Sequence, residues 1–482
     1  MSKKKKQEMK EPPTNRNILW ITYAIVLLFL GLAVYIGYFL RFQGPEVINN
    51  SYNARLDSFA DRVHRGRILA ADGTVLAHNE EDEDGNEIRV YDHGDVFAHV
   101  VGYSTKGKTG IEALANFYLL TSHVNLIEQA GNELAGKKNL GDDAVTTLDM
   151  DLQQAAYSAL GDRRGAVIAM EPGTGKILAM VSKPDFDPNT IADDWDTFVS
   201  DDSDSSVLLN RATQGQYPPG STFKIFTTLE YIHENADYAD YHFDCSGEYT
   251  VGTKTIHCHN NKRHGSEDLK TSFANSCNSS YASLGLTLDL EQFDDLCDQM
   301  LFNTALPTDF ESSKSSFVLE PGDSDSAVME TSIGQGKTLV TPFHMALIAS
   351  AIANDGVLMK PYVIDRITDA EGEVVEQYEP AEYKTLLSES DASVLQEYMR
   401  YVVEEGTATK LKSDSYEAAG KTGSAEFSSS SDATHSWFVG YAHSGEEPDI
   451  AVAVIVENSG VGSEYAVPIA KQIFDAYYTW EN

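Results

Sequence analysis

The chain has 482 residues, of which 42% are hydrophobic, so it can bury a large core and is long enough for more than one domain. Its 74 acidic residues outnumber its 36 basic residues and give a formal net charge of -38. Because nucleic-acid binding requires clustered lysine and arginine, this balance argues against a nucleic-acid partner. It favours a solvated acidic surface whose like charges repel other molecules and keep the protein soluble.

An uncharged apolar run near the N-terminus predicts one transmembrane helix. Residues 18–40 carry no charged side chain and extend about 35 Å as a helix, which is enough to span a bilayer. The basic tail, residues 1–17, precedes this run, and the acidic bulk of the chain follows it. The positive-inside rule therefore places the tail in the cytoplasm and the rest of the chain outside. No small-residue cleavage pattern follows the run, so we expect an uncleaved single-pass anchor.

Residues 41–148 read as a separate module. They combine a polar amphipathic segment with a predicted strand pair around the turn "ADGT" at residues 71–74. The segment offers no arrangement of side chains that would serve as a nucleophile and its base. We predict an elongated α+β pedestal with an interaction or dimerisation-like role.

From about residue 149 to residue 482 the pattern predicts one mixed α/β domain. Apolar spacing predicts a helix at residues 152–160, and residues 164–183 read as two strands joined by a Pro-Gly-Thr-Gly turn. Further elements are a predicted helix over 221–236, three predicted strands over 415–427, 436–443 and 449–458, and a final helix over 466–480. Strands near both ends of this region, with a helical middle, predict an antiparallel sheet flanked by helices.

Ser221 and Lys224 are spaced i, i+3 in the stretch "YPPGSTFKIF", at the predicted start of a helix. This spacing places both side chains on one face, and the preceding breaker puts Ser221 where free backbone N–H groups favour negative charge. A lysine accepts a proton only when it is neutral. We therefore expect burial and the charge of Lys421 to lower the pKa of Lys224. Alone, the pair fits a serine-capped helix with a solvated lysine better than a nucleophile with its base.

Two later motifs change that balance. Ser276 and Asn278 flank Cys277 in a polar triplet, where the serine can relay a proton and the asparagine can hold both the lysine and a substrate amide. Lys421-Thr422-Gly423-Ser424 lies in a predicted strand, and Gly423 allows an extended substrate to approach it. Ser-x-x-Lys, Ser-x-Asn and Lys-Thr-Gly in this order are typical of serine acyl transferases of the penicillin-binding type.

On these motifs the chain resembles the class B penicillin-binding proteins, which are membrane-anchored peptidoglycan D,D-transpeptidases. The phrases "RGRILAADGTVLA", "TSIGQGKTLVTPFHMA" and "HSWFVGYA" extend the resemblance over nearly all of residues 18–482, within a PbpA-like or elongation-type branch. The resemblance implies a bacterial cell membrane location with the catalytic domain outside. It also implies β-lactam binding, stem peptides ending in D-Ala-D-Ala as substrate, and a SEDS-type membrane glycan polymerase as partner.

The resemblance also implies a role for each site residue. Ser221 would attack the penultimate D-Ala carbonyl with Lys224 as base, and Ser276 would pass the proton onward. Backbone N–H groups of Ser221 and Ser424 would form the oxyanion hole. Asn278 would orient the acyl amide, while Lys421, Thr422 and Ser424 would bind the terminal carboxylate. No cofactor is expected for this chemistry.

Two other functions fit the same motifs. A class D-like β-lactamase would acylate the same serine and then hydrolyse the product rapidly. A non-catalytic β-lactam sensor or cell-wall scaffold would use the fold without turnover. The sequence also leaves open whether the protein serves elongation, division or sporulation.

The four cysteines form a second cluster of interest. Cys245, Cys258, His264 and Cys277 make a Cys₃His set that suits tetrahedral zinc, although the spacing is not a standard finger pattern. A disulfide between Cys245 and Cys258 is the alternative in an oxidising compartment, and buried free thiols are a third reading. Cys297 has no partner in this scheme.

Overall fold

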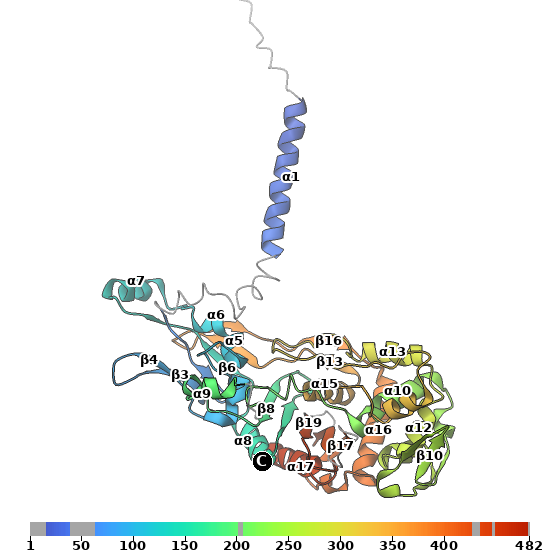
Figure 1. Ribbon diagram of the computed structural model, residues 1–482. Helices are drawn as coiled ribbons and strands as arrows, with labels where there is room; N and C mark the ends of the chain where they lie inside the picture. The colour runs from blue at the N-terminus through green and yellow to red at the C-terminus, as the bar shows by residue number, and fades with distance from the viewer. Residues whose placement is uncertain (1–15, 39–62, 201–205, 427–433, 446–448, 481–482) are drawn as a thin grey trace, which may run out of the picture.

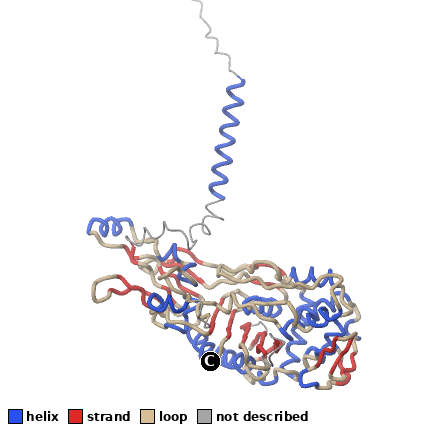
Figure 2. The backbone as a smooth tube through the Cα atoms, in the orientation of Figure 1, coloured by secondary structure: helices blue, strands red, loops and turns tan. Residues whose placement is uncertain are grey.

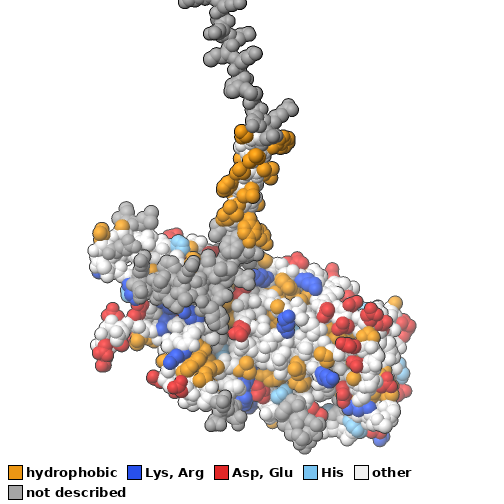
Figure 3. Space-filling view, turned by 45° about the horizontal axis from the view of Figure 1, so that its top comes forward, with side chains coloured by type: hydrophobic (Ala, Val, Ile, Leu, Met, Phe, Trp, Pro, Cys, Tyr) orange, Lys and Arg blue, Asp and Glu red, His pale blue; other side chains and the backbone are white. Residues whose placement is uncertain are grey.

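The computed structural model describes residues 16–38, 63–200, 206–426, 434–445 and 449–480. Helix α1 (Arg16–Tyr38) contains the stretch Ile18–Tyr38, which is long and apolar enough to cross a membrane. Figure 3 shows its apolar side chains at the surface of the helix. The predicted span reached residue 40, and its last two residues lie outside the described ranges.

A five-stranded antiparallel sheet forms the centre of the C-terminal region, in the order β17-β18-β19-β7-β8 (Figures 1 and 2). Its strands are β7 (Gly165–Met170), β8 (Ile177–Lys183), β17 (Glu417–Glu426), β18 (Thr434–His443) and β19 (Ile450–Val456). The sequence predicted these five strands and their antiparallel sheet. The first and last strands of the region meet where β7 pairs with β19, so the fold closes on itself.

Three helices cover this sheet. Helix α15 (Pro342–Ala353) packs on β7, β18 and β19 and is buried along its whole length. Helices α8 (Met150–Leu160) and α17 (Ala466–Trp480) pack against each other and against the sheet. Because every residue of β19 is buried, both faces of the sheet are covered, which explains why its strands read as continuous apolar runs.

A group of helices beside the sheet carries the Ser-x-x-Lys and Ser-x-Asn motifs. It consists of α10 (Lys224–Glu234), α11 (Leu269–Ala274), α12 (Asn278–Gly285), α13 (Leu290–Gln299), α14 (Asp325–Ser332) and α16 (Glu389–Glu404). An aromatic cluster fixes the start of α10: Phe223 stacks on Phe317 with ring centroids 5.9 Å apart, and Phe226 meets Phe302 edge-on at 5.0 Å. This packing holds the turn that contains Ser221.

The pedestal is built on a six-stranded sheet in the order β15-β14-β6-β2-β3-β4. Its strands are β2 (Ile68–Leu69), β3 (Val75–Glu81), β4 (Glu87–Val90), β6 (Asp143–Thr146), β14 (Ile364–Thr368) and β15 (Val374–Gln377). The predicted strand pair at the "ADGT" turn is β2 with β3. Strands β14 and β15 come from the later part of the chain and complete this sheet, which local pattern did not predict.

The remaining elements are short. In the pedestal they are β1 (Val63–His64), β5 (Asn139–Leu140), η2 (Gly94–Phe97), α4 (Ala98–Val101), α5 (Gly110–Leu114), α6 (Asn116–Leu119) and α7 (Leu126–Ala135). Beyond it are α9 (Ile191–Phe198), η4 (Tyr238–Asp240), β9 (Phe243–Cys245), β10 (Glu248–Val251), β11 (Lys254–His257), η5 (His259–Asn261), β12 (Gly265–Glu267), β13 (Val357–Met359), β16 (Glu382–Thr385) and η6 (Thr409–Leu411).

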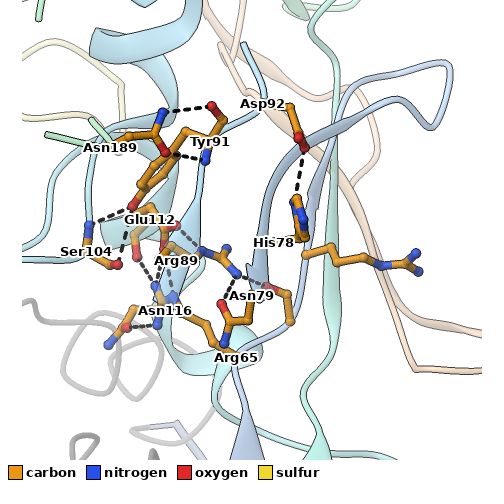
Figure 4. A network of polar contacts seen from close by, with 12 residues as sticks. Arg65, His78, Asn79, Arg89, Tyr91, Asp92, Ser104, Glu112, Asn116 and Asn189 are labelled. Atoms are coloured by element: carbon orange, nitrogen blue, oxygen red, sulfur yellow. Dashed lines mark hydrogen bonds and ion pairs between the residues drawn. The ribbon is translucent and has the colours of Figure 1, made fainter. Parts of the chain in front are cut away.

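A buried ionic network holds the pedestal together (Figure 4). The carboxylate of Glu112 is fully buried and accepts from Arg65 Nε at 2.7 Å and from Arg89 Nε at 2.7 Å. Burial alone would raise the pKa of Glu112, but the two guanidinium groups lower it below its ordinary value. The carboxylate is therefore charged and forms ion pairs with two arginines from distant parts of the pedestal sequence.

The amide of Asn189 ties the pedestal to the C-terminal region (Figure 4). Its Oδ1 accepts from the backbone N–H of Tyr91 at 2.9 Å, and its Nδ2 donates to the backbone oxygen of Tyr91 at 3.0 Å. The side chain thus pairs with the pedestal backbone as a neighbouring strand would.

Replacing Glu112 by alanine should lower the free energy of unfolding of the pedestal by about 3–5 kcal/mol, since it leaves two arginines buried without their anion. Thermal unfolding of the full chain checks this, with Glu83→Ala on the exposed turn after β3 as the matched control. A Glu112→Ala protein as stable as the control would contradict the role given to this network.

Candidate active site

Ser221 lies on a single turn of 3-10 helix, η3 (Gly220–Phe223), directly before α10. The sequence predicted a helix start here, and the structure makes its first turn a tight one. Gly220 has φ +53°, and a Cβ atom there would lie 2.7 Å from the backbone oxygen of Ser424. Only glycine allows this approach, which brings the Ser221 turn against the edge of β17.

Lys224 is fully buried at the start of α10. Its Nζ donates to Ser276 O at 2.8 Å, to Ser276 Oγ at 3.2 Å and to Asn278 Oδ1 at 2.8 Å. Within the described residues these bonds join Lys224 to the polar triplet rather than to the Ser221 hydroxyl. The ammonium group is therefore positioned by Ser276 and Asn278, one helical turn away from Ser221.

Backbone strain at Ser276 makes this double contact available. The residue has φ +56°, a conformation that serine rarely adopts, between the end of α11 and the start of α12. Next to it, Cys277 caps α12, and its Sγ accepts from Ser280 N at 3.4 Å. The left-handed turn presents the carbonyl and the hydroxyl of Ser276 to the same lysine, as strained residues at functional sites often do.

Lys421 approaches Ser276 from β17. Its buried Nζ donates to Ser276 Oγ at 3.0 Å and to Thr422 O at 3.0 Å. The hydroxyl of Ser276 consequently lies between two lysine nitrogens that come from a helix and a strand. This chain of hydrogen bonds can hand a proton in either direction.

The two lysines differ in how far their pKa values fall. Burial lowers the pKa of Lys224 to about 8, against a weaker opposite effect of Cys277, Cys258 and Glu267. Burial, with the charge of Lys224, lowers the pKa of Lys421 well below its ordinary value. The predicted direction for Lys224 is confirmed, but the repulsion acts on Lys421.

The remaining predicted binding residues lie together on β17. Thr422 Oγ1 is 2.6 Å from Thr407 Oγ1, and Ser424 Oγ accepts from Gly462 N at 3.2 Å. A Cβ atom at Gly423 would lie 3.0 Å from the backbone oxygen of Pro219, so the strand sits close against the Ser221 turn. The structure therefore brings every predicted residue of the three motifs into one site.

Four neighbouring residues were not singled out from the sequence. Thr407 contacts Thr422, and Trp437 Nε1 donates to Pro218 O at 3.0 Å. The charge of Glu267 raises the pKa of Lys224, and the side chain of Gln335 faces the end of β17. Gln335 and Trp437 occur in the phrases "TSIGQGKTLVTPFHMA" and "HSWFVGYA", which are among those that support the family resemblance. Thr407 and Glu267 lie outside any recognisable motif.

The predicted Cys₃His set converges beside the polar triplet. Sγ of Cys258 is 3.7 Å from Sγ of Cys245 and 3.7 Å from Sγ of Cys277, while Cys245 Sγ is 3.5 Å from His264 Nδ1. All four ligand atoms lie within 4.8 Å of one another. In this structure the sulfurs of Cys245 and Cys258 are further apart than the roughly 2.05 Å of a disulfide bond, so it contains both cysteines as free thiols.

These separations fit a tetrahedral zinc centre. Zinc bonds of about 2.3 Å to sulfur and 2.0 Å to nitrogen give tetrahedral edges of about 3.8 Å between sulfurs and about 3.5 Å between sulfur and nitrogen. The observed values of 3.7 Å and 3.5 Å agree. Cys297 is instead buried in the main hydrophobic core.

Two family models match the chain. The penicillin binding protein transpeptidase domain matches residues 165–475, and the penicillin binding protein A dimerisation domain matches residues 65–144. The first match includes all three motifs of the site.

Characterised relatives agree with these matches. The peptidoglycan D,D-transpeptidase PbpA of Mycolicibacterium smegmatis is 31% identical over 438 residues, which cover 84% of this chain and 87% of that protein. The crystal structure of a D,D-transpeptidase domain from Eggerthella lenta aligns with a TM-score of 0.78 at 30% identity and covers 87% of this chain and 99% of its own. The ceftriaxone acyl-enzyme complex of penicillin-binding protein A from M. tuberculosis aligns with a TM-score of 0.79 at 28% identity, over 87% and 99% of the two chains.

The rate at which a β-lactam acylates Ser221 should rise with pH through a midpoint near 8, because only neutral Lys224 accepts the serine proton and its pKa is about 8. Second-order rate constants for covalent labelling across this range test the expectation. In Glu267→Gln the midpoint should move to lower pH, since that carboxylate favours the charged lysine. A rate independent of pH from about 6 to 10 would exclude Lys224 as the base.

Proposed function

The chain belongs to the penicillin-binding protein transpeptidase family and is a peptidoglycan D,D-transpeptidase, and from this premise we propose that it works through an acyl-enzyme on Ser221. The observation that carries the proposal is the buried chain Lys224–Ser276–Lys421 beside the Ser221 turn. It offers a base of lowered pKa and a route for the proton beside Ser221, whose turn Gly220 brings against β17.

In the acylation step, Ser221 Oγ attacks the carbonyl carbon of the penultimate D-Ala of a stem peptide. Neutral Lys224 takes the hydroxyl proton, and Ser276 passes it on to the leaving nitrogen, so that D-Ala departs as a neutral amine. The backbone N–H groups of Ser221 and Ser424 stabilise the oxyanion, a contribution of about 3 kcal/mol for each donor in comparable enzymes.

In the second step an amine from a neighbouring stem attacks the acyl-enzyme. Its proton returns through Lys224 and Ser276 to Ser221 as the ester bond breaks, and the new amide is the crosslink. Asn278 orients the acyl amide, and Thr422 with Ser424 binds the terminal carboxylate of the donor. The arriving carboxylate also supplies the anion that lets Lys421 take up a proton. β-Lactams acylate the same serine.

The Cys₃His cluster is a structural zinc site. Three sulfurs and one imidazole nitrogen, mostly buried, would form a closed site without an open position for substrate. Cys277 lies between Ser276 and Asn278, so a metal held there would fix the strained turn that contacts Lys224. Catalysis itself proceeds without a cofactor.

The apolar helix α1 and the relatives fit a membrane-anchored protein. The basic tail is cytoplasmic and the catalytic region lies outside, as the positive-inside rule requires. The span and the pedestal bind a SEDS-type membrane glycan polymerase, which supplies the glycan strands that carry the stems.

The domain limits proposed from the sequence are a tail (1–17), an anchor (18–40), a pedestal (41–148) and a transpeptidase domain (149–482). The two family matches fall inside the last two segments. Strands β14 and β15 belong to the pedestal sheet although they lie within the transpeptidase segment.

Replacing Ser221 by alanine should abolish covalent labelling of the full chain by a fluorescent penicillin, because the other hydroxyl on this turn, Thr222 Oγ1, is buried and donates to Pro219 O at 2.8 Å. Persistent labelling of Ser221→Ala would refute the assignment. The wild type should release bound penicillin slowly, whereas fast nitrocefin turnover would identify a hydrolase of the class D type.

Purified full chain should contain about one zinc per molecule, and Cys258→Ser should lose it, because that sulfur contacts two of the other ligands. We expect the variant to be acylated more slowly than wild type, since the triplet loses its support. Elemental analysis measures the zinc content, and thiol counting after denaturation measures the number of free cysteines. Absence of zinc together with two missing thiols would establish the disulfide instead.

A further inference from the structure

Among the strands that the structure describes, β17 pairs along one edge only, and its open edge lies beside the Ser221 turn. Its other edge pairs with β18 along the whole strand, from Glu417 to Glu426. In an antiparallel strand the backbone groups of alternate residues point to opposite edges. Ser424 O faces Gly220 and hence lies on the open edge, and Thr422 and Glu426 share that edge by the same alternation.

The side-chain amide of Gln335 occupies the end of this open edge. With its nitrogen toward Glu426 O at 3.1 Å and its oxygen toward Glu426 N at 3.2 Å, it satisfies both backbone groups. An added strand would use these same two groups to continue beyond Ser424. The amide therefore stands where the third pairing position of a substrate strand would lie.

The segment that carries Gln335 also supports the nucleophile turn. Gly334 O accepts from Gly220 N at 2.8 Å, and a Cβ atom at Gly334 would lie 1.8 Å from Gly220 O. The backbone N–H of Gln335 donates to Glu330 O at 2.9 Å and so anchors the segment on α14. The short loop of Gly334 and Gln335 consequently contacts both the Ser221 turn and β17, the two segments that supply the proposed oxyanion donors.

We propose that Gln335 is a positioning and specificity-determining residue that closes the open edge of β17 at Glu426, so that a donor peptide pairs its main chain only with Thr422 and Ser424. The inference rests on the proposed function. Under it the enzyme recognises the backbone of the terminal D-Ala-D-Ala unit alone. Donor residues that precede this unit do not pair with the backbone of β17, so the enzyme can recognise them only through side chains.

The test uses donors that differ only in main chain: acetyl-D-Ala-D-Ala, the same ending extended by three glycines, and the extended peptide N-methylated two residues before the acylated D-Ala. Release of D-Ala by the full chain gives kcat and KM for each. In wild type the three donors should have kcat/KM values within about twofold of one another, because in the described part of β17 the open-edge backbone groups beyond Ser424, those of Glu426, already pair with Gln335.

Gln335→Ala should lower kcat for every donor by about tenfold, since β17 loses a support for Ser424. It should also prefer the extended peptide over the short one, and N-methylation should remove that preference. The kcat of Gln335→Glu, divided by the wild-type kcat at the same pH, should rise towards one as the pH falls. Only a protonated carboxyl group both donates and accepts a hydrogen bond, as the amide does.

Gln396→Ala is the matched control. Gln396 Nε2 donates to the backbone oxygen of Ile352 at 2.8 Å, away from the site, so its loss removes a similar bond without touching β17. The control should keep the wild-type kinetics, and unfolding temperatures verify that each variant is folded.

A Gln335→Ala protein with wild-type kcat, or with reduced kcat but no preference for the extended donor, would overturn the proposal. Penicillin labelling of wild type in the same preparation separates this failure from a failure of the proposed function, which would appear as absence of labelling at Ser221.

Discussion

The site depends on one hydroxyl group, Ser276 Oγ, held between two fully buried lysine nitrogens. Burying two ammonium groups side by side without an anion would be very costly, so at least one must give up its proton. Burial thereby lowers the pKa of Lys224 to about 8, so that this lysine becomes available as a base at a much lower pH than an exposed lysine. Each of the surrounding elements positions one of these three groups.

Helix α10 delivers Lys224, strand β17 delivers Lys421, and the strained turn between α11 and α12 delivers Ser276. The aromatic cluster around Phe223 fixes the first of these elements, and the pairing of β17 with β18 fixes the second. The third has the least intrinsic stability, because its φ is positive and its residues are polar. The cysteine cluster lies at this turn, where an external support has the greatest effect.

The sequence alone predicted the five-stranded sheet, the helix after Ser221 and all the motif residues of the site. These succeed because buried strands are continuous apolar runs and because the motifs constrain chemistry that few other residues can supply. It did not predict that β14 and β15 complete the pedestal sheet, since pairing between distant segments leaves no local pattern. Nor could it predict that the repulsion between the two lysines acts on the pKa of Lys421, because this follows from their burial and from their contact through Ser276.

The central claim concerns protonation, and an NMR titration of ¹⁵N-labelled lysine side chains in the full chain measures it directly. The account predicts that the Nζ resonance assigned to Lys224 titrates near pH 8 and that the pKa of Lys421 lies well below its ordinary value. Assignment would use Lys224→Arg and Lys421→Arg proteins. Two lysines that both keep their protons above about pH 10 would contradict the account.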